Sequence, residues 1–236
     1  MRKVLEPVTG AERRSRTPRS GQYQLDLVAD AAALAVLGRA PVAVLSEESG
    51  WSGDRGAAVT VVLDPVDGST NAARGIPYWG TSLCAVDADG PLAALVVNHA
   101  TGVATTATRG GGAWRDGRPA VPARAERVTD AVVALSGAPD RWLPWKQFRA
   151  LGSIALALCD VAAGVIEGVV DGWAQHAPWD YLGGLLACSE VGAVVVDAAG
   201  RDLAEIGPGV RRQVIAAATP ALLDELRQAL VPDGTA

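Results

Sequence analysis

Apolar residues recur along the chain in two kinds of spacing, and these predict its helices and strands. Between Leu25 and Val36 the apolar positions follow a helical repeat that ends at Gly38, so we expect a helix there. The run 42–45 predicts a short strand, and the run 57–63 is apolar except at one position, which is typical of a strand buried on both faces. Similar patterns predict strands at 81–86, 92–98, 131–135, 165–170, 194–197 and 214–218, and helices at 154–163, 179–191 and 220–230.

The order of these elements predicts a layered α/β fold with mixed sheets. Hairpins and strand–helix alternations both occur, and the Asp-Gly pair within the glycine-rich segment 110–118 favours a tight hairpin turn. We expect one domain over residues 22–230, with halves at about 22–135 and 136–230, and a tail at 231–236. Residues 1–21 hold six Arg and Lys residues without a hydrophobic repeat, which predicts a flexible arm. A tail that attracts RNA or phosphate is the alternative.

Composition and charge exclude several classes of protein. Hydrophobic residues make up 49% of the 236-residue chain and charged residues 20%, so the chain can build a core and is not disordered. The formal net charge of −5 and the pI near 5.1 argue against a general nucleic-acid or membrane-surface binder. Because no signal-peptide core and no apolar run of about 20 residues occurs, we expect a cytoplasmic protein. Three scattered Cys and two His argue against a disulfide framework and a His-rich zinc site.

Two aspartates follow the second apolar run, in the segment 64–71 (DPVDGSTN). Buried carboxylates are costly unless something compensates them, so Asp64 and Asp67 predict a site for a hard divalent cation such as Mg²⁺. Gly68 permits the close approach of a ligand, and Ser69 stands at a helix start whose free backbone N–H groups attract phosphate. A turn followed by an ordinary helix cap is the alternative interpretation of the same residues.

Three motifs lie along the chain in a fixed order. They are Ser46–Ser49 (SEES), the segment 64–71, and the segment 179–186 (WDYLGGLL), which is followed by 190–193 (EVGA). The glycine-rich segment 110–118 lies between the second motif and the third. From about Gln22 to Leu230 this pattern resembles the inositol monophosphatase family of Mg²⁺-dependent, lithium-sensitive phosphomonoesterases. The resemblance implies the αβαβα sandwich with mixed sheets of the inositol monophosphatase/fructose bisphosphatase-like class. The first half would then bind metal and phosphate, and the second half would face the substrate.

The resemblance also implies roles for individual residues. The metal ligands would be Glu47, Asp64, the Val66 carbonyl, Asp67 and Asp180, and they would hold two or three Mg²⁺ ions. Glu47, Ser69 and Asp30 would be the catalytic residues, with Asp30 supporting the Ser69 hydroxyl that orients the attacking water. Gly68 and Ser69 would bind the phosphate. Outside this set, His176 is a candidate for the mouth of the pocket, because it lies four residues before Asp180.

Elementary chemistry supports the same assignment. A phosphate monoester dianion repels a nucleophile, so catalysis depends on positioning and on charge neutralisation. Two Mg²⁺ ions lower the pKa of a bound water and stabilise the attacking and leaving oxygens of an in-line displacement. Such a site needs no His base, which suits a chain with two His.

The residues expected to face the substrate leave its identity open. Gly152, Ser153 and Trp173 stand at substrate positions of the family, but Trp173 replaces a glutamate that contacts substrate hydroxyls in inositol-cleaving members. We predict a Mg²⁺-dependent phosphomonoesterase that hydrolyses a small phosphorylated metabolite, an inositol-1-phosphate-like or related sugar or cyclitol phosphate, with a metal-activated water. The alternatives are a histidinol-phosphate or 3′-phosphoadenosine phosphate phosphatase and a non-catalytic metal- or RNA-associated member. We also expect a homodimer without a membrane or nucleic-acid partner.

Overall fold

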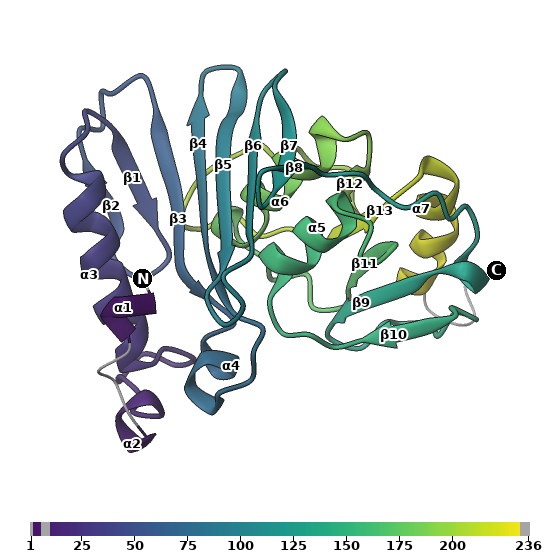
Figure 1. Ribbon diagram of the computed structural model, residues 1–236, viewed down its shortest axis with the longest axis horizontal. Helices are drawn as coiled ribbons and strands as arrows, with labels where there is room; N and C mark the ends of the chain where they lie inside the picture. The colour runs from purple at the N-terminus through teal and green to yellow at the C-terminus, as the bar shows by residue number, and fades with distance from the viewer. Residues whose placement is uncertain (1, 6–9, 232–236) are drawn as a thin grey trace.

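Five layers stack through the molecule in the order helix, sheet, helices, sheet and helix (Figure 1). Helix α3 (Gln24–Leu37) covers the outer face of an eight-stranded sheet, and α7 (Pro220–Leu226) covers the outer face of a five-stranded sheet. Helices α5 (Ile154–Ala162) and α6 (Pro178–Glu190) fill the space between the two sheets. The predicted layered α/β fold, an αβαβα sandwich with mixed sheets, is confirmed.

The structure is a computed structural model that describes residues 2–5 and 10–231. Residues 1 and 6–9 of the predicted arm and residues 232–236 of the predicted tail lie outside the described part of the chain. The remaining elements outside the sheets are α1 (Arg2–Leu5), α2 (Gly10–Arg13), α4 (Ser69–Arg74) and two 3₁₀ turns at Val128–Asp130 and Arg227–Leu230.

The eight-stranded sheet carries the first half of the chain. Its strands are β1 (Ala43–Ser46), β2 (Gly50–Gly53), β3 (Thr60–Asp67), β4 (Gly80–Asp87), β5 (Gly90–Asn98), β6 (Ala104–Thr108), β7 (Gly112–Arg115) and β8 (Arg118–Pro119). They follow the order β2-β1-β3-β4-β5-β6-β7-β8, in which only β1 and β3 pair in parallel. The sequence did not indicate β2 and β6, because their short Gly-, Ser- and Thr-rich stretches carry little hydrophobic signal.

The five-stranded sheet carries the second half. Its strands are β9 (Val132–Ser136), β10 (Gln147–Arg149), β11 (Gly168–Asp171), β12 (Val194–Asp197) and β13 (Val214–Ala217). In the order β10-β9-β11-β13-β12, strand β9 pairs in parallel with both neighbours and β13 pairs antiparallel with both. Both sheets are therefore mixed or largely antiparallel, as the alternation of hairpins and helices predicts.

Two glycines in the middle of α6 let this helix pack close to its neighbours. A Cβ atom at Gly184 would lie 2.3 Å from Cβ of Leu158 in α5, and one at Gly183 would lie 2.8 Å from Cγ2 of Val96 in β5. Real side chains do not tolerate such distances, so only glycine permits this packing. Helix α6 thus packs closely on both α5 and the large sheet, which it also contacts through β3 and β4.

The segment before residue 22 packs on the domain where the structure describes it. Helices α1 and α2 lie against α3, and Leu5 is buried in a cluster that includes Tyr23, Ala29 and Trp79. Arg19 donates a hydrogen bond of 3.1 Å to the Glu47 carbonyl, next to the first predicted metal ligand. These contacts hold the described residues of the segment against the domain, and the flexibility expected of the arm stays a prediction.

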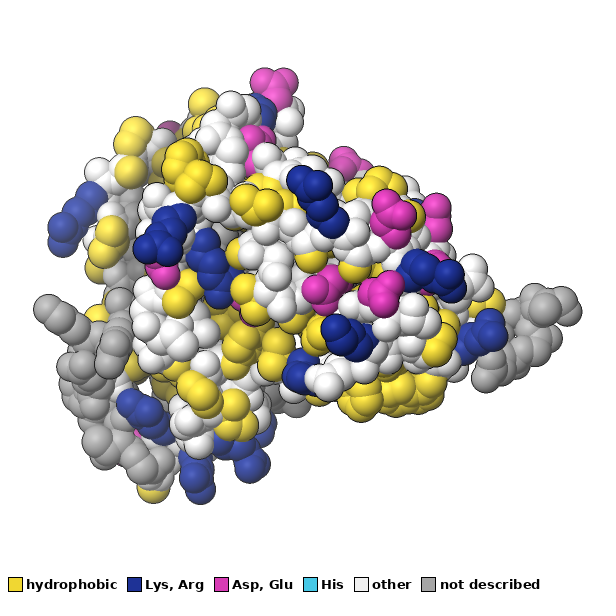
Figure 2. Space-filling model, turned by 45° about the vertical axis from the view of Figure 1, so that its right-hand side comes forward, with side chains coloured by type: hydrophobic (Ala, Val, Ile, Leu, Met, Phe, Trp, Pro, Cys, Tyr) yellow, Lys and Arg dark blue, Asp and Glu magenta, His cyan; other side chains and the backbone are white. Residues whose placement is uncertain are grey.

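The surface mixes both signs of charge. Figure 2 shows acidic and basic side chains interspersed over one face of the molecule, with apolar side chains gathered at its lower edge. Trp142, Trp145 and Phe148 form an aromatic cluster, in which the ring of Trp142 meets both others edge-on at centroid distances of 5.6 and 5.1 Å. Among the described residues, no helix has the length and apolar character needed to cross a membrane.

Candidate active site

The end of β3 carries two carboxylates on the same side of the large sheet. Between Asp64 and Asp67 strand β3 advances three residues, while its partner β4 advances two, from Ser82 to Gly80. Side chains three apart in a regular strand point to opposite faces, and the extra residue returns Asp67 to the side of Asp64. Pro65 lies in this irregular stretch, where a residue without an N–H leaves no ladder hydrogen bond unmade.

Glu47, Asp64 and Asp180 come together from three separate elements. Glu47 follows β1, Asp64 lies in β3 and Asp180 lies in the first turn of α6, and each offers a carboxylate oxygen within 4.8 Å of the others. Asp67 lies near this group, and its charge raises the pKa of both Glu47 and Asp64. The structure thus brings together the four acidic side chains that the sequence predicts as metal ligands. We call these four residues the acidic cluster.

Burial and mutual repulsion disfavour the charged forms of this cluster. Burial raises the pKa of Asp64 well above its usual range, and the charges of Glu47, Asp67 and Asp180 raise it further. The pKa of Glu47 is raised in the same way, first by burial and then by Asp180. Burial and the charge of Asp180 raise the pKa of Asp67 to about 7. A hard divalent cation removes this repulsion and prefers oxygen ligands, so the donor set fits Mg²⁺.

Backbone and side-chain donors orient two of these carboxylates. Oδ2 of Asp67 accepts hydrogen bonds from the Ser153 hydroxyl at 2.6 Å and from the Ala155 N–H at 2.7 Å, both at the start of α5. Oδ2 of Asp180 accepts a hydrogen bond of 2.6 Å from the Ala177 N–H, at the start of α6. Each carboxylate therefore lies at the positive end of a helix, which favours its negative charge.

Gly68 and Ser69 connect β3 to α4. Gly68 has a φ of 87°, and a Cβ atom there would lie 3.0 Å from the Gly152 carbonyl oxygen and 3.1 Å from that of Tyr78. Both the left-handed conformation and the crowding require glycine at this position. The Ser69 hydroxyl donates a hydrogen bond of 2.8 Å to the Val66 carbonyl, so the predicted phosphate contact and the predicted carbonyl ligand are neighbours.

Asp26 lies near the Ser69 hydroxyl, whereas Asp30 is hydrogen-bonded to Ser46. Oδ1 of Asp30 accepts a hydrogen bond of 2.5 Å from the Ser46 hydroxyl of β1. Asp26 lies one helical turn earlier, where its Oδ2 accepts a hydrogen bond of 2.8 Å from the Tyr23 N–H and its buried Oδ1 has no hydrogen-bond partner among the described residues. Burial raises the pKa of Asp26 to about 6, and the Tyr23 N–H and the Ser69 hydroxyl oppose this rise.

Among the described residues, the structure pairs Asp30 with Ser46 and shows no hydrogen bond from Asp30 to Ser69, the contact that the sequence predicts. The two aspartates are four residues apart and occupy the same buried face of α3, so the helical repeat alone does not distinguish them. The position of Asp26 in the first turn of the predicted helix could have distinguished the two, because acidic residues there bond to the backbone at the helix start.

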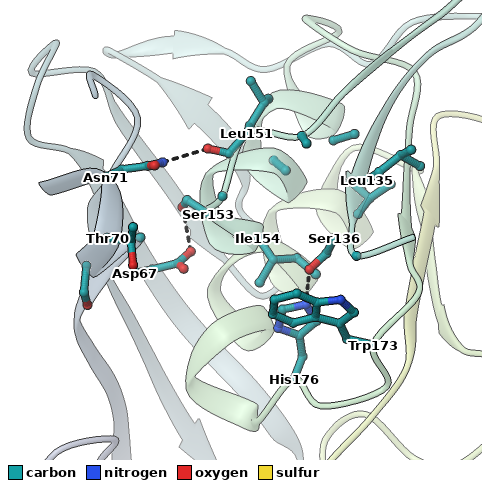
Figure 3. A pocket seen from close by; sticks show the side chains of 18 residues that line it. Asp67, Thr70, Asn71, Leu135, Ser136, Leu151, Ser153, Ile154, Trp173 and His176 are labelled. Atoms are coloured by element: carbon teal, nitrogen blue, oxygen red, sulfur yellow. Dashed lines mark hydrogen bonds between the residues drawn. The ribbon is translucent and has the colours of Figure 1, made fainter. Parts of the chain in front are cut away.

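A cleft of about 480 Å³ opens beside the acidic cluster (Figure 3). Its labelled side chains are Asp67, Thr70 and Asn71 on one side, and Leu135, Ser136, Leu151, Ser153, Ile154, Trp173 and His176 around the rest. The predicted phosphate contacts Gly68 and Ser69 and the predicted substrate contacts Gly152, Ser153 and Trp173 all line this cleft. Of the acidic cluster, Asp67 is the member that lines it.

His176 links the acidic cluster to the cleft. Its Nδ1 lies 3.4 Å from Oδ2 of Asp180, and its Nε2 lies 2.9 Å from the hydroxyl of Ser136. Burial alone would lower the pKa of His176, but the hydrogen bond and charge of Asp180, together with the charge of Asp171, raise it. The expected place of His176 at the pocket is confirmed. Ser136, forty residues earlier, belongs to no motif, and its contribution becomes visible only in the fold.

The arrangement has one chemical consequence for any ligand. Four carboxylates beside a cleft repel an anion, whereas the same carboxylates around a divalent cation attract one. The site therefore suits an anionic substrate that binds together with a cation, with Ser69 and the Gly68 backbone at the edge of the cleft.

Comparisons with known proteins identify the family of the chain. A family model described as the inositol monophosphatase family matches residues 12–233. The chain is 32% identical over 69% of its length to a fructose-1,6-bisphosphatase of Pyrococcus furiosus, and 39% identical over 62% of its length to a fructose-1,6-bisphosphatase/inositol-1-monophosphatase of Archaeoglobus fulgidus. These matches span 64% and 57% of the two relatives, less than two thirds of either.

The solved structures agree on the fold. A hypothetical protein from Pyrococcus horikoshii, described as having similarities to inositol-1 monophosphatase, superposes with a TM-score of 0.86 at 26% identity. The superposition covers 97% of this chain and 93% of that one. All five layers therefore have a counterpart in an experimental structure.

Proposed function

Because the chain belongs to the inositol monophosphatase family, we propose that it is a Mg²⁺-dependent phosphomonoesterase that hydrolyses a small phosphorylated metabolite. One observation carries the proposal: Glu47, Asp64 and Asp180 offer carboxylate oxygens within 4.8 Å of one another. Three carboxylates held so close in a partly buried site are unfavourable unless a cation compensates them. The cleft beside them is large enough for a small organic phosphate.

The donor set suits two or three hard divalent cations. Glu47, Asp64 and Asp180 would hold one ion, and Asp67 with Asp64 and Asp180 would hold a second, with the Val66 carbonyl as a further ligand. Oδ2 of Asp67 is occupied by hydrogen bonds from α5, so its Oδ1 would be the ligand atom. A cation bound there supplies positive charge that neutralises a phosphate dianion and lowers the pKa of water.

Three side chains would position the attacking water. The Glu47 carboxylate would accept a hydrogen bond from it, and the Ser69 hydroxyl, which in this structure donates to the Val66 carbonyl, would hold it in line with the phosphorus atom. Asp26 would support the Ser69 hydroxyl from behind, because Oδ1 of Asp26 is buried without a hydrogen-bond partner among the described residues. Gly68 would let the phosphate approach the backbone closely.

A phosphate-release assay over a panel of substrates tests this proposal. The panel should contain inositol, sugar, amino-alcohol and nucleotide monophosphates, each measured with Mg²⁺ and with a chelator. We expect phosphate release from at least one of them, and we expect the chelator to abolish it and added Mg²⁺ to restore it. Phosphate release that persists in the chelator would refute the role of the acidic cluster, and the absence of release from every substrate would refute the phosphatase itself.

A further inference from the structure

The polar side chains around the cleft are already hydrogen-bonded within the protein. The Thr70 hydroxyl lies 3.3 Å from that of Tyr23, the Asn71 amide donates to the Tyr78 and Leu151 carbonyls at 2.7 Å each, Ser136 pairs with His176, and Ser153 pairs with Asp67. These bonds use the donor groups of Asn71 and Ser153, so neither side chain is free to donate to a substrate hydroxyl, although their oxygens can still accept. The cleft therefore offers few free side-chain donors to a leaving group that carries many hydroxyls.

The wall away from the acidic cluster is apolar. It is formed by Ala134, Leu135, Leu151, Ile154, Ala157 and Val169. Figure 3 shows Leu135 and Ile154 across the cavity from Asp67, with Trp173 below them. An apolar wall of this kind favours an apolar leaving group, which has few hydrogen bonds to water to give up when it binds.

Trp173 is held at this end of the cleft by the backbone around it. Oδ1 of the fully buried Asp171 accepts hydrogen bonds from the N–H groups of Trp173 at 2.8 Å and of Ala174 at 3.3 Å, and Ala174 has a φ of 56°. The five-membered part of the indole ring packs on Gly137, where a Cβ atom would lie 2.0 Å from Cδ1 of the tryptophan. The ring is thus fixed in place, although 67% of the residue is exposed.

We propose that the cleft binds phosphate monoesters whose leaving alcohol carries a planar aromatic ring, and that Trp173 stacks on that ring. This proposal rests on the proposed phosphatase function and adds the substrate class. A fixed, exposed indole costs little conformational entropy when it stacks on a second ring, and its burial removes apolar surface from water. A nucleobase and an aryl group share this chemistry. Stacking on an aromatic side chain changes binding by about tenfold or more.

The test compares four substrates that differ in the leaving group. Benzyl phosphate carries a planar ring, cyclohexylmethyl phosphate a saturated apolar ring, and myo-inositol 1-phosphate a ring of hydroxyls, while adenosine 2′-monophosphate represents the nucleobase source. We expect kcat/KM for benzyl phosphate or adenosine 2′-monophosphate to exceed that for the other two by about tenfold or more. Of these two planar substrates, the one with the higher kcat/KM shows whether the ring is an aryl group or a nucleobase.

A variant of Trp173 separates stacking from general apolar binding. Trp173→Ala should reduce the ratio of kcat/KM between the best planar substrate and cyclohexylmethyl phosphate by about tenfold, mainly through KM, and Trp173→Phe should preserve most of the ratio. Trp114→Ala, which removes an exposed tryptophan on β7 outside the cleft, should leave the ratio unchanged.

The outcomes distinguish this proposal from the one on which it rests. Hydrolysis of all four substrates at similar kcat/KM, a preference for myo-inositol 1-phosphate, or an unchanged ratio in Trp173→Ala would overturn the aromatic substrate class while leaving the phosphatase intact. If none of the four substrates and none of the wider panel is hydrolysed in a Mg²⁺-dependent way, both the aromatic substrate class and the proposed phosphatase function are overturned.

Discussion

The Ser153 hydroxyl donates a hydrogen bond of 2.6 Å to Oδ2 of Asp67 and so joins the start of α5 to the end of β3. The two residues lie 86 positions apart in the sequence. This bond and the one from the Ala155 N–H oppose the burial that raises the pKa of Asp67. The packing of the middle helical layer on the large sheet therefore affects the charge and the orientation of a proposed metal ligand.

Ser153→Ala should lower the free energy of unfolding by about 2–3 kcal/mol. It removes a hydrogen bond to a buried carboxylate and also the helix cap that accepts from the Leu156 N–H. Urea denaturation of the cation-free protein measures the change. The matched variant Ser189→Ala loses only an exposed hydroxyl bonded to the Leu185 carbonyl, and it should change stability by less than about 0.5 kcal/mol. Equal effects of the two variants would show that the bond to Asp67 contributes nothing.

Without a bound cation, stability should fall as the pH rises from 5 to 8. The pKa of Asp67 is about 7 in the fold against 3.8 ordinarily, so between these values the folded chain keeps a proton that the unfolded chain has released. The raised pKa of His176 acts in the same direction, because the stability it contributes is present in acid and lost as the pH rises. Asp197, whose pKa is lowered, loses its contribution only in stronger acid.

Thermal unfolding of the cation-free protein measures this slope. The Tm should be lower at pH 8 than at pH 5, Mg²⁺ should restore much of the difference at pH 8, and Asp67→Asn should flatten the dependence. A Tm that rises over this interval in the absence of Mg²⁺ would contradict the repulsion within the acidic cluster.

Ser69→Ala should lower kcat by about 10²–10³ with little change in KM. The hydroxyl is proposed to orient the attacking water, an interaction that matters chiefly in the transition state. Steady-state kinetics on the best substrate of the panel measures the split between the two constants. Ser69→Thr keeps a hydroxyl at the same place and should retain most of the activity. A rise in KM with unchanged kcat would make Ser69 a residue of substrate binding alone.

Asp26→Asn should resemble Ser69→Ala, and the double variant should be little worse than either single one. Residues that act through one another lose additivity, because the first substitution already removes the interaction. Asp30→Asn provides the matched control on the same helix face, since its carboxylate bonds to Ser46 instead. Asp30→Asn should lower the free energy of unfolding and have little effect on kcat. Additive losses of kcat for Asp26 and Ser69, or a larger loss of kcat for Asp30, would restore the assignment made from the sequence.

The sequence predicts the residues of the acidic cluster, but it does not predict the residues that hydrogen-bond to the cluster and to Ser69. Asp64 and Asp67 follow a buried strand and can be found from that local pattern, whereas Glu47 and Asp180 come from the motifs that resemble the family. The pairing of Ser136 with His176 depends on how β9 meets the loop before α6, which no local pattern encodes. The choice between Asp26 and Asp30 likewise depends on where α4 packs against α3.

The apolar character of the cleft was only partly visible in the sequence. Trp173 could be recognised because it replaces an expected hydrogen-bond acceptor, but the contact of its ring with Gly137 is a property of the fold. Strand β10 also escaped detection, because its three residues are exposed and lie within a Pro- and Trp-rich connection.

The most direct test of the proposed metal-dependent hydrolysis is the Mg²⁺-dependent kcat/KM of Asp64→Asn on the best substrate of the panel. The change removes one charge from the centre of the acidic cluster with almost no change in volume, and we expect a loss of at least about 10³-fold. The cation-free variant should remain folded and be at least as stable as the parent, because it relieves repulsion. Asp89→Asn, which changes an exposed carboxylate, should stay within about twofold of the parent. Activity of Asp64→Asn within a few-fold of the parent would contradict a catalytic cation at Glu47, Asp64 and Asp180.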